Sequence, residues 1–239
     1  RRVGGSGGNG RSENRGRARS PAIMQAIRAF RYSHWSQVAT PRKRPRQRRS
    51  RETVAWIEEA AAQLFDRYGY AATTTNKIAE RAGVSIGTLY RYFPNKDALL
   101  WSLAERHLEA TAAEVTDALA RAAAEELPLP SLLHDLVHRV AALHTARPTL
   151  HRLLFDRAPR TPDLVARFRA AELAIAARLA GHLRRLGVAR SDPETAALLA
   201  VQGVEAQIHG VMLTPPAGRD RDTLLAAIVT QWHRALTEW

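Results

Sequence analysis

The 239-residue sequence predicts an all-α protein with an N-terminal three-helix helix-turn-helix domain and a larger C-terminal helical domain. From Ser50 onward, apolar residues recur at steps of three and four, the spacing of one face of an α-helix. No stretch shows the alternation and the Val, Ile and Thr content of a strand. Prolines separate the helical segments, at Pro128, Pro130, Pro148, Pro162, Pro193, Pro215 and Pro216.

The first predicted helix has one apolar face and ends at Gly69, a residue that readily adopts the left-handed backbone of a helix end. That face consists of Val54, Ile57, Ala61, Leu64, Phe65 and Tyr68. Thr74 is expected to cap a short second helix that runs to Arg81 and is closed by Gly83. These signals predict two helices joined by a short connection.

Ser85 is expected to cap a third helix, which ends before Pro94 because the residue preceding a proline is disfavoured in the α conformation. A fourth helix starts near Asn95 and continues through Leu99, Leu100 and Leu103. Further helices are predicted at 113–126, 131–145, 148–157, 162–186, 192–213 and 221–237. We therefore place the helix-turn-helix domain at 48–97 and the second helical domain at 98–239.

The formal net charge of +13 is confined to the N-terminal end of the chain. Residues 1–51 hold 15 Lys and Arg and one acid, Glu13, which leaves 21 basic and 22 acidic residues in the rest. We expect residues 1–47 to form a disordered basic arm, because they lack apolar side chains to offset the ordering entropy. The arm, with Arg44 and Arg46 just before the first helix, either follows DNA phosphates and the minor groove or serves only as a solubilising tail.

The chain has no cysteine, which excludes disulfides, thiolate metal sites and a cysteine nucleophile. A reducing cytoplasm is the compartment that this composition favours. No apolar run approaches the ~20 residues of a membrane helix. We therefore expect a cytoplasmic protein without membrane contact.

Residues 74–93 have the layout of a helix-turn-helix, with two short helices around a glycine-containing turn. One set of side chains can seal a small core: Ile78, Ala79, Ala82, Val84 and Leu89. A second set faces outward from the N-terminal half of the second helix: Ile86, Gly87, Thr88, Tyr90 and Arg91. In helix-turn-helix proteins this half enters the major groove, so the outward set is a candidate DNA-reading surface.

This segment resembles the DNA-binding domain of TetR/AcrR-type regulators over residues 50–103. The matching residues are Phe65, Gly69, Ile78-Ala79, Ala82-Gly83-Val84, Gly87-Thr88-Leu89-Tyr90, Tyr92-Phe93, Lys96 and Leu99-Leu100. The resemblance implies base contacts from the outward set and phosphate contacts from Thr74, Thr75, Tyr92 and Lys96. Asn76 and Lys77 depart from the family pattern. The competing interpretation is that the aromatic residues belong to the core and that Lys96 is a solvated charge.

The same resemblance implies a homodimer, a cavity beneath the C-terminal helices, and a repressor that a small-molecule effector releases from double-stranded operator DNA. Independent support for the dimer comes from small residues on one side of helix 192–213, which allow a second helix to approach. They are Leu199, Gly203, Ala206 and Gly210. A neighbouring polar stripe, Gln202, Glu205 and His209, either bonds across the dimer or lines the cavity.

Four residues are candidates for the cavity wall: Trp101, His144, Phe155 and Phe168. Ordinary core packing is the equally plausible alternative for them. His134 and His138 have the i, i+4 spacing of a helical metal pair, but the helical wheel turns them toward solvent, so we expect no metal site and no cofactor.

The sequence contains no nucleophile elbow, no Walker loop and no dinucleotide-binding glycine motif after a strand, so no enzyme is predicted. The remaining alternative class is a protein that coats nucleic acid through its basic arm. That class predicts binding that is independent of base sequence, whereas the helix-turn-helix predicts discrimination.

Overall fold

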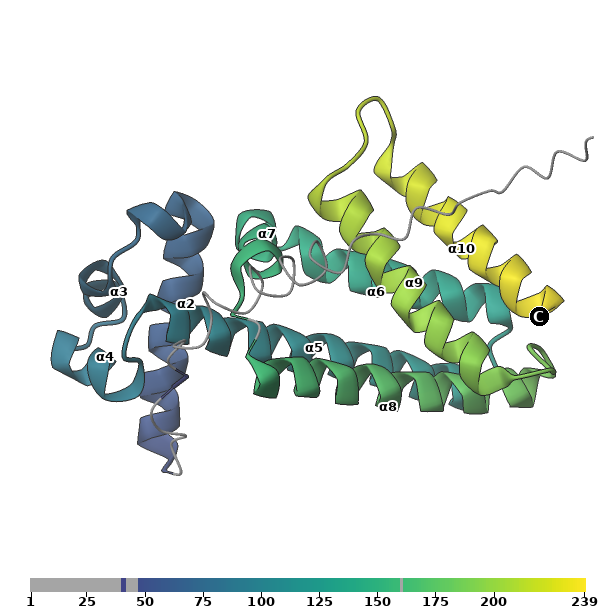
Figure 1. Ribbon diagram of the computed structural model, residues 1–239, viewed down its shortest axis with the longest axis horizontal. Helices are drawn as coiled ribbons and strands as arrows, with labels where there is room; N and C mark the ends of the chain where they lie inside the picture. Colours follow the sequence, from purple (N-terminus) through teal and green to yellow (C-terminus); the bar gives the residue numbers. More distant parts are fainter. Residues whose placement is uncertain (1–39, 42–46, 160) are drawn as a thin grey trace, which may run out of the picture. The chain divides into compact units, whose positions relative to one another are not determined.

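The computed structural model describes residues 40–41, 47–159 and 161–239, and within them it consists of helices without strands (Figure 1). The helices are α2 (Arg48–Ala72), α3 (Thr75–Arg81), α4 (Ile86–Tyr92), α5 (Lys96–Ala124), α6 (Leu129–Thr145), α7 (Pro148–Arg157), α8 (Pro162–Leu186), α9 (Pro193–Leu213) and α10 (Arg221–Glu238). The all-α prediction is confirmed. The basic arm lies outside the described residues, apart from Thr40, Pro41 and Gln47.

The helix starts follow the capping residues of the sequence. The side chains of Thr74, Ser85 and Asn95 each accept a hydrogen bond from the backbone N–H three residues later, which satisfies a donor that the helix itself leaves free. Asp192 caps α9 in the same way. Gly69 has φ +73°, so the regular part of α2 breaks there as predicted.

The first four helices share one core. The side chains of Ile57 and Phe65 on α2, Ile78 on α3 and Leu89 on α4 are fully buried together with Leu99 on α5. The start of α5 thus packs with α2, α3 and α4, although most of the helix lies beyond them. This shared packing fixes α3 and α4 against α2.

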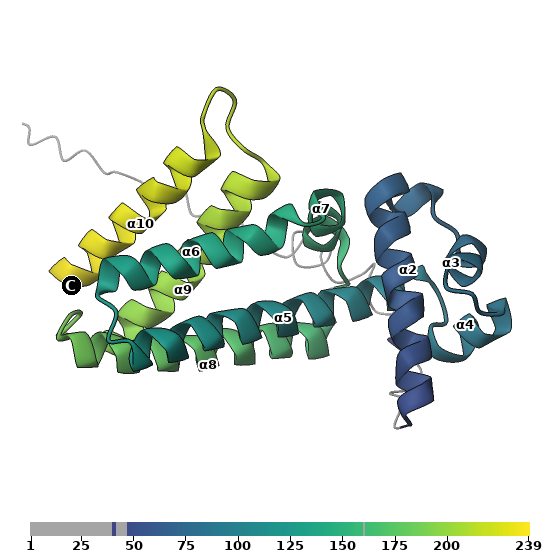
Figure 2. The same cartoon turned by 180° about the vertical axis from the view of Figure 1, so that it is seen from behind.

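Helix α5 is a single helix of 29 residues, where the sequence had predicted two segments. The connecting stretch, residues 104–112, contains alanine, leucine and glutamate but no glycine or proline, so nothing interrupts the helix. Figure 1 and the reverse view in Figure 2 both show α5 and α8 side by side, with α9 crossing them. A continuous α5 therefore links the two domains.

Helix α9 is 21 residues long and contains an 18-residue stretch with a mean hydropathy of 1.3, so by length and composition it could cross a membrane. Gln202 and Glu205 interrupt this helix, so it contains no uninterrupted apolar run of ~20 residues. The evidence for a membrane span is weak, because Ala196, Ala197 and Ala200 pack in a core with residues of α6, α8 and α10. A core helix passes the same test.

Gly203 on α9 contacts α10 of the same chain. A Cβ added to Gly203 would lie 2.1 Å from Cζ2 of Trp232, whose indole Nε1 donates to Gln207 Oε1 at 2.8 Å. The small size of Gly203 thus allows Trp232 to pack closely against α9 within one chain, and the place of Gly203 in the dimer seam stays a prediction.

Gly203→Ala is expected to lower the free energy of unfolding by ~1–3 kcal/mol, because the new methyl group displaces the Trp232 ring. Denaturant unfolding followed by circular dichroism measures the change. The matched control is Gly181→Ala in α8, where nothing lies within 4 Å of the added Cβ. That variant should gain up to ~1 kcal/mol from helix propensity. Equal effects of the two substitutions would contradict the assigned role of Gly203.

Candidate DNA-binding interface

The turn between α3 and α4 is held by backbone hydrogen bonds. The Gly83 N–H donates to the Glu80 carbonyl at 3.1 Å, and the Val84 N–H donates to the Ala79 carbonyl at 3.0 Å. Gly83 has φ +67°, a conformation that disfavours residues with a Cβ. The turn therefore fixes the direction in which α4 leaves α3.

The predicted core residues hold α4 in place, since Ile78, Ala79 and Leu89 are buried and Ala82 and Val84 pack against them. The opposite side of α4 is open. Its exposed residues are Ile86, Gly87, Tyr90 and Arg91, and Thr88 is half-buried beside them. The structure therefore places the predicted reading surface on one exposed side of α4.

Hydrogen bonds orient the hydroxyl groups of this surface. The Tyr90 hydroxyl lies 3.0 Å from Oγ1 of Thr75 on α3, and Oγ1 of Thr88 lies 2.9 Å from the Ser85 hydroxyl. The first pair joins a predicted base contact to a predicted phosphate contact. Thr74 is also exposed, but its side chain accepts from the Lys77 N–H as a helix cap. Hydroxyl groups held in this way lose less conformational entropy when they bind.

Tyr92 and Lys96, two predicted phosphate contacts, make more contacts within the chain than the sequence suggested. Tyr92 is buried, and the Arg91 guanidinium lies 5.1 Å from its ring centre. The Lys96 ammonium donates to the carbonyls of Tyr70 and Thr73, both at 2.8 Å, and lies 4.2 Å from the Tyr70 ring centre. Both residues thus support the segment before α3 and the end of α4. Their phosphate contacts stay a prediction.

Arg44 and Arg46 lie outside the described residues. The described part of the chain continues the basic run with the exposed Arg48, Arg49 and Arg51 at the start of α2. Arg48 forms an exposed ion pair with Glu52 at 3.4 Å, which contributes little stability. This end of α2 therefore presents three exposed cations.

Helix α7 docks onto α2 through contacts that the sequence did not reveal. Asp66 Oδ1 accepts the Leu150 N–H at 3.0 Å, and Glu59 Oε1 pairs with the Arg147 guanidinium at 2.5 Å. The hydrogen bond from Arg147 keeps the pKa of Glu59 below its usual value. The start of α7 has no local side-chain cap, so Asp66 supplies it from 84 residues away. No local pattern could have indicated this partner.

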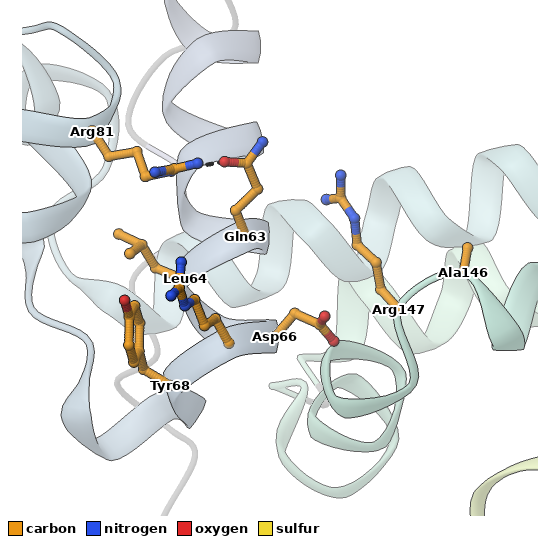
Figure 3. A pocket seen from close by; sticks show the side chains of 8 residues that line it. Gln63, Leu64, Asp66, Tyr68, Arg81, Ala146 and Arg147 are labelled. Carbon is orange, nitrogen blue, oxygen red and sulfur yellow. Dashed lines mark hydrogen bonds between the residues drawn. The ribbon is translucent and has the colours of Figure 1, made fainter.

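A crevice of about 330 Å³ opens beside this junction (Figure 3). Figure 3 shows Asp66 on α2 and Arg147 at the start of α7 at its edge, with Arg81 of α3 hydrogen-bonded to Gln63. The Arg81 Nε to Gln63 Oε1 distance is 2.7 Å. The helix-turn-helix is thus linked to α2, and α2 to α7.

A second link joins α2 to α5. Glu58 is buried and accepts from the Ser102 hydroxyl at 2.5 Å and from the Arg106 guanidinium at 3.0 Å. Burial raises the pKa of Glu58, although both hydrogen bonds oppose that shift. The DNA-binding domain therefore contacts the second domain through α5 and through α7.

The C-terminal domain contains an apolar cavity of about 120 Å³ between α5, α6, α8 and α9. Phe168 and Glu205 are among the residues that line it, and the pKa of Glu205 is raised by desolvation and by the neighbouring Glu172. The other three candidates for the cavity wall lie elsewhere. Trp101 is buried and donates to Thr161 Oγ1 at 3.0 Å, and Phe155 and His144 both contact His209.

The sequence matches two family descriptions along most of its described length. Residues 57–103 match "Bacterial regulatory proteins, tetR family", and residues 128–234 match "Tetracyclin repressor-like, C-terminal domain". The chain is 47% identical over 57 residues to the uncharacterised HTH-type transcriptional regulator YvkB of Bacillus subtilis, covering 24% of this chain and 30% of that protein. It is 38% identical over 60 residues to an HTH-type transcriptional regulator of Staphylococcus aureus, covering 25% and 32%. The chain thus matches less than a third of the length of these relatives.

Solved structures extend the similarity to both domains. SmeT, the repressor of a multidrug efflux pump of Stenotrophomonas maltophilia, superposes with a TM-score of 0.57 at 23% identity, covering 77% of this chain and 91% of SmeT. A TetR family regulator from Marinobacter aquaeolei gives a TM-score of 0.53 at 20% identity, covering 79% and 97%. At this identity the likeness establishes a shared fold.

Proposed function

Because the chain belongs to the TetR family of bacterial transcription regulators, we propose that it is a dimeric repressor that a small-molecule effector releases from its operator. The family consists of transcription regulators and not of enzymes, and this chain is one of them. The observation that supports operator recognition best is the exposed side of α4, where the hydroxyls of Thr88 and Tyr90 are held by Ser85 and Thr75. Such groups discriminate base edges in the major groove.

Phosphate contacts position such a surface on the duplex. We assign them to Thr74 and Thr75 at the start of α3, to the third ammonium hydrogen of Lys96, and to Arg44 and Arg46 of the basic arm. The cations among them, Lys96, Arg44 and Arg46, add affinity that falls as the salt concentration rises and that does not depend on base sequence. The preference for operator over random DNA therefore depends on α4, whereas the total affinity depends on α4 and on the phosphate contacts together.

A competition gel shift at fixed salt tests this function, with the duplex upstream of the encoding gene against a random duplex. A sequence-specific regulator should prefer the upstream duplex by ~10³-fold or more. Equal affinity for both duplexes would favour the alternative of a protein that coats nucleic acid through its basic arm.

For the dimer we assign the exposed side of α9, where Leu199, Ala206 and Gly210 lie at the surface and no atom approaches an added Cβ at Gly210. A two-fold dimer would place two recognition helices about one DNA turn apart, ~34–36 Å, or somewhat further. Small residues on this side permit close approach of the partner helix.

Leu199→Glu is expected to shift the chain from dimer to monomer, because the new carboxylate would lose its hydration in the interface. Light scattering at micromolar concentration measures the shift. The matched control is Leu173→Glu on α8, since both leucines are exposed, at 41% for Leu199 and 47% for Leu173. A monomeric unmodified chain, or equal behaviour of the two variants, would rule out this interface.

The effector site that we assign is the apolar cavity lined by Phe168. Its volume of about 120 Å³ is below the ~300–1,000 Å³ of typical ligand sites. A ligand of ordinary size would therefore bind a conformation in which the cavity is wider. A preference for that conformation is what a ligand needs in order to shift the equilibrium away from the DNA-bound state.

A further inference from the structure

Four histidines from four helices lie together outside the apolar cavity. They are His107 on α5, His144 on α6, His151 on α7 and His209 on α9. The ring centres are 4.0 Å apart for His107 and His151, 4.3 Å for His144 and His151, and 4.7 Å for His144 and His209. One ring nitrogen from each of the first three lies within 4.8 Å of the other two.

The hydrogen bonding of His144 leaves a buried lone pair. Its Nδ1 lies 2.8 Å from the Val140 carbonyl, which can only accept, so the proton of the neutral ring is on Nδ1. The unprotonated Nε2 is then an acceptor, and it is buried with no hydrogen-bond partner in the described part of the chain. The His144 residue is only 3% exposed, so bulk water does not compensate. A buried acceptor in this state is destabilising unless a ligand satisfies it.

The hydrogen bond between His144 Nδ1 and the Val140 carbonyl is of the kind that orients metal-binding histidines. A ligating imidazole usually donates its second N–H to a carbonyl or carboxylate, which fixes the ring and directs the other nitrogen to the metal. His209 has a comparable bond to the Glu205 carbonyl. Burial lowers the pKa of His107 to about 4 and that of His151 to about 3, with further lowering by neighbouring histidines. Near pH 7 these rings are therefore neutral, the form that binds metals.

We propose that His107, His144 and His151 form a binding site for a divalent transition-metal ion, with Zn²⁺ as the representative ion. Imidazole nitrogens suit Zn²⁺, Co²⁺, Ni²⁺ and Cu²⁺, whereas Mg²⁺ and Ca²⁺ prefer oxygen ligands. Bond lengths of about 2.0–2.1 Å in a tetrahedron place the nitrogens ~3.3 Å apart, so side-chain movements on the order of 1 Å complete the site. A water molecule or His209 supplies the fourth ligand.

The site differs from the pair that the sequence singled out. His134 and His138 lie with ring centres 4.2 Å apart, but His134 is exposed, and no third ligand accompanies them in the described residues. The triad draws its members from three helices, which local spacing cannot reveal. Helix α7 carries His151 and is the helix that Asp66 caps from α2, so a bound ion would tie α7 to α5 and α6 at the contact with the DNA-binding domain.

Titration of the untagged full-length chain with Co²⁺ and then Zn²⁺ tests the proposal without DNA, so its outcome is separate from that of the proposed function. We expect one Co²⁺ per chain, with the visible absorption bands of tetrahedral nitrogen coordination, and its displacement by Zn²⁺. His144→Leu and His151→Leu should weaken binding by ~100-fold or more, since loss of an outer-shell partner alone costs ~10–100-fold. The matched control, the double variant His134→Leu and His138→Leu, should bind as the unmodified chain does.

X-ray absorption at the zinc edge of the unmodified, zinc-loaded chain gives a second measurement that does not depend on the folding of variants. At least three imidazole nitrogens at about 2.0 Å are expected. The proposal is overturned if stoichiometric binding is absent, if the bound ion has two or fewer imidazoles, or if the control pair and not the triad is required for binding.

Discussion

Replacing Thr88 and Tyr90 with alanine is expected to abolish the preference for operator over random duplex while the chain stays folded. Each lost base contact should cost ~1–3 kcal/mol, which is about 5- to 150-fold in the affinity ratio. The fold should persist because Tyr90 is 42% exposed and the cap of α4 uses the Ser85 hydroxyl and the backbone of residue 88. Alanine is also the most favourable helix residue.

Quantitative gel shifts with operator and random duplex at the same salt measure this ratio for each single variant and for the pair. The matched control is Tyr68→Ala, which removes another exposed tyrosine of the same domain, on α2 and not on α4. Its affinity ratio should equal that of the unmodified chain. Discrimination that survives in the double variant would place the reading surface elsewhere.

The helix-turn-helix could be predicted closely because its determinants are local. Thr74, Ser85 and Asn95 each bond to an N–H three residues away, and Gly83 supplies the positive φ of the turn. Apolar spacing then identified Leu89 as the residue that anchors α4. Each of these signals operates within one turn or one helix, so a single sequence contains them.

The remaining features depend on contacts between distant segments. Asp66 caps α7 from 84 residues away, and Gly203 is small because of Trp232 on the next helix. A helical wheel can place Gly203 on a face but cannot tell whether α10 or a second chain covers that face. The single helix α5 differs from the prediction for another reason. Residues 104–112 contain no residue that ends a helix, but the sequence analysis placed a break there.

Removing the contacts between α2 and α7 is expected to uncouple the effector from the DNA. Helix α5 is one connecting element, since Lys96 lies at its start, beside α2 to α4, and His107 lies further along. The structure adds α7, which docks on α2 through the Asp66 cap and the pair of Glu59 with Arg147. An effector that lowers operator affinity by a typical ~5- to 150-fold should act through both helices.

The double variant Asp66→Ala and Arg147→Gln should reduce this factor toward one, while operator and effector each still bind. Loss of the cap should also lower the free energy of unfolding by ~0.5–2 kcal/mol. The ion pair contributes less, because both partners are more than a third exposed and exposed pairs are worth ~0.2–1 kcal/mol. The cap therefore accounts for most of the expected loss in the free energy of unfolding.

The probe is a small molecule that raises the melting temperature of the chain. Operator titrations with and without a saturating amount of this molecule measure the factor by which it lowers operator affinity. Titrations of the molecule with and without operator should return the same factor, because coupling is reciprocal. The matched control is Arg139→Gln on α6, which breaks exposed ion pairs with Glu114 on α5 and with Asp135 on α6, away from α2. Its factor should match that of the unmodified chain. If the α2–α7 variant also keeps the full factor, then α5 alone transmits the signal, and the junction at Asp66 only stabilises the fold.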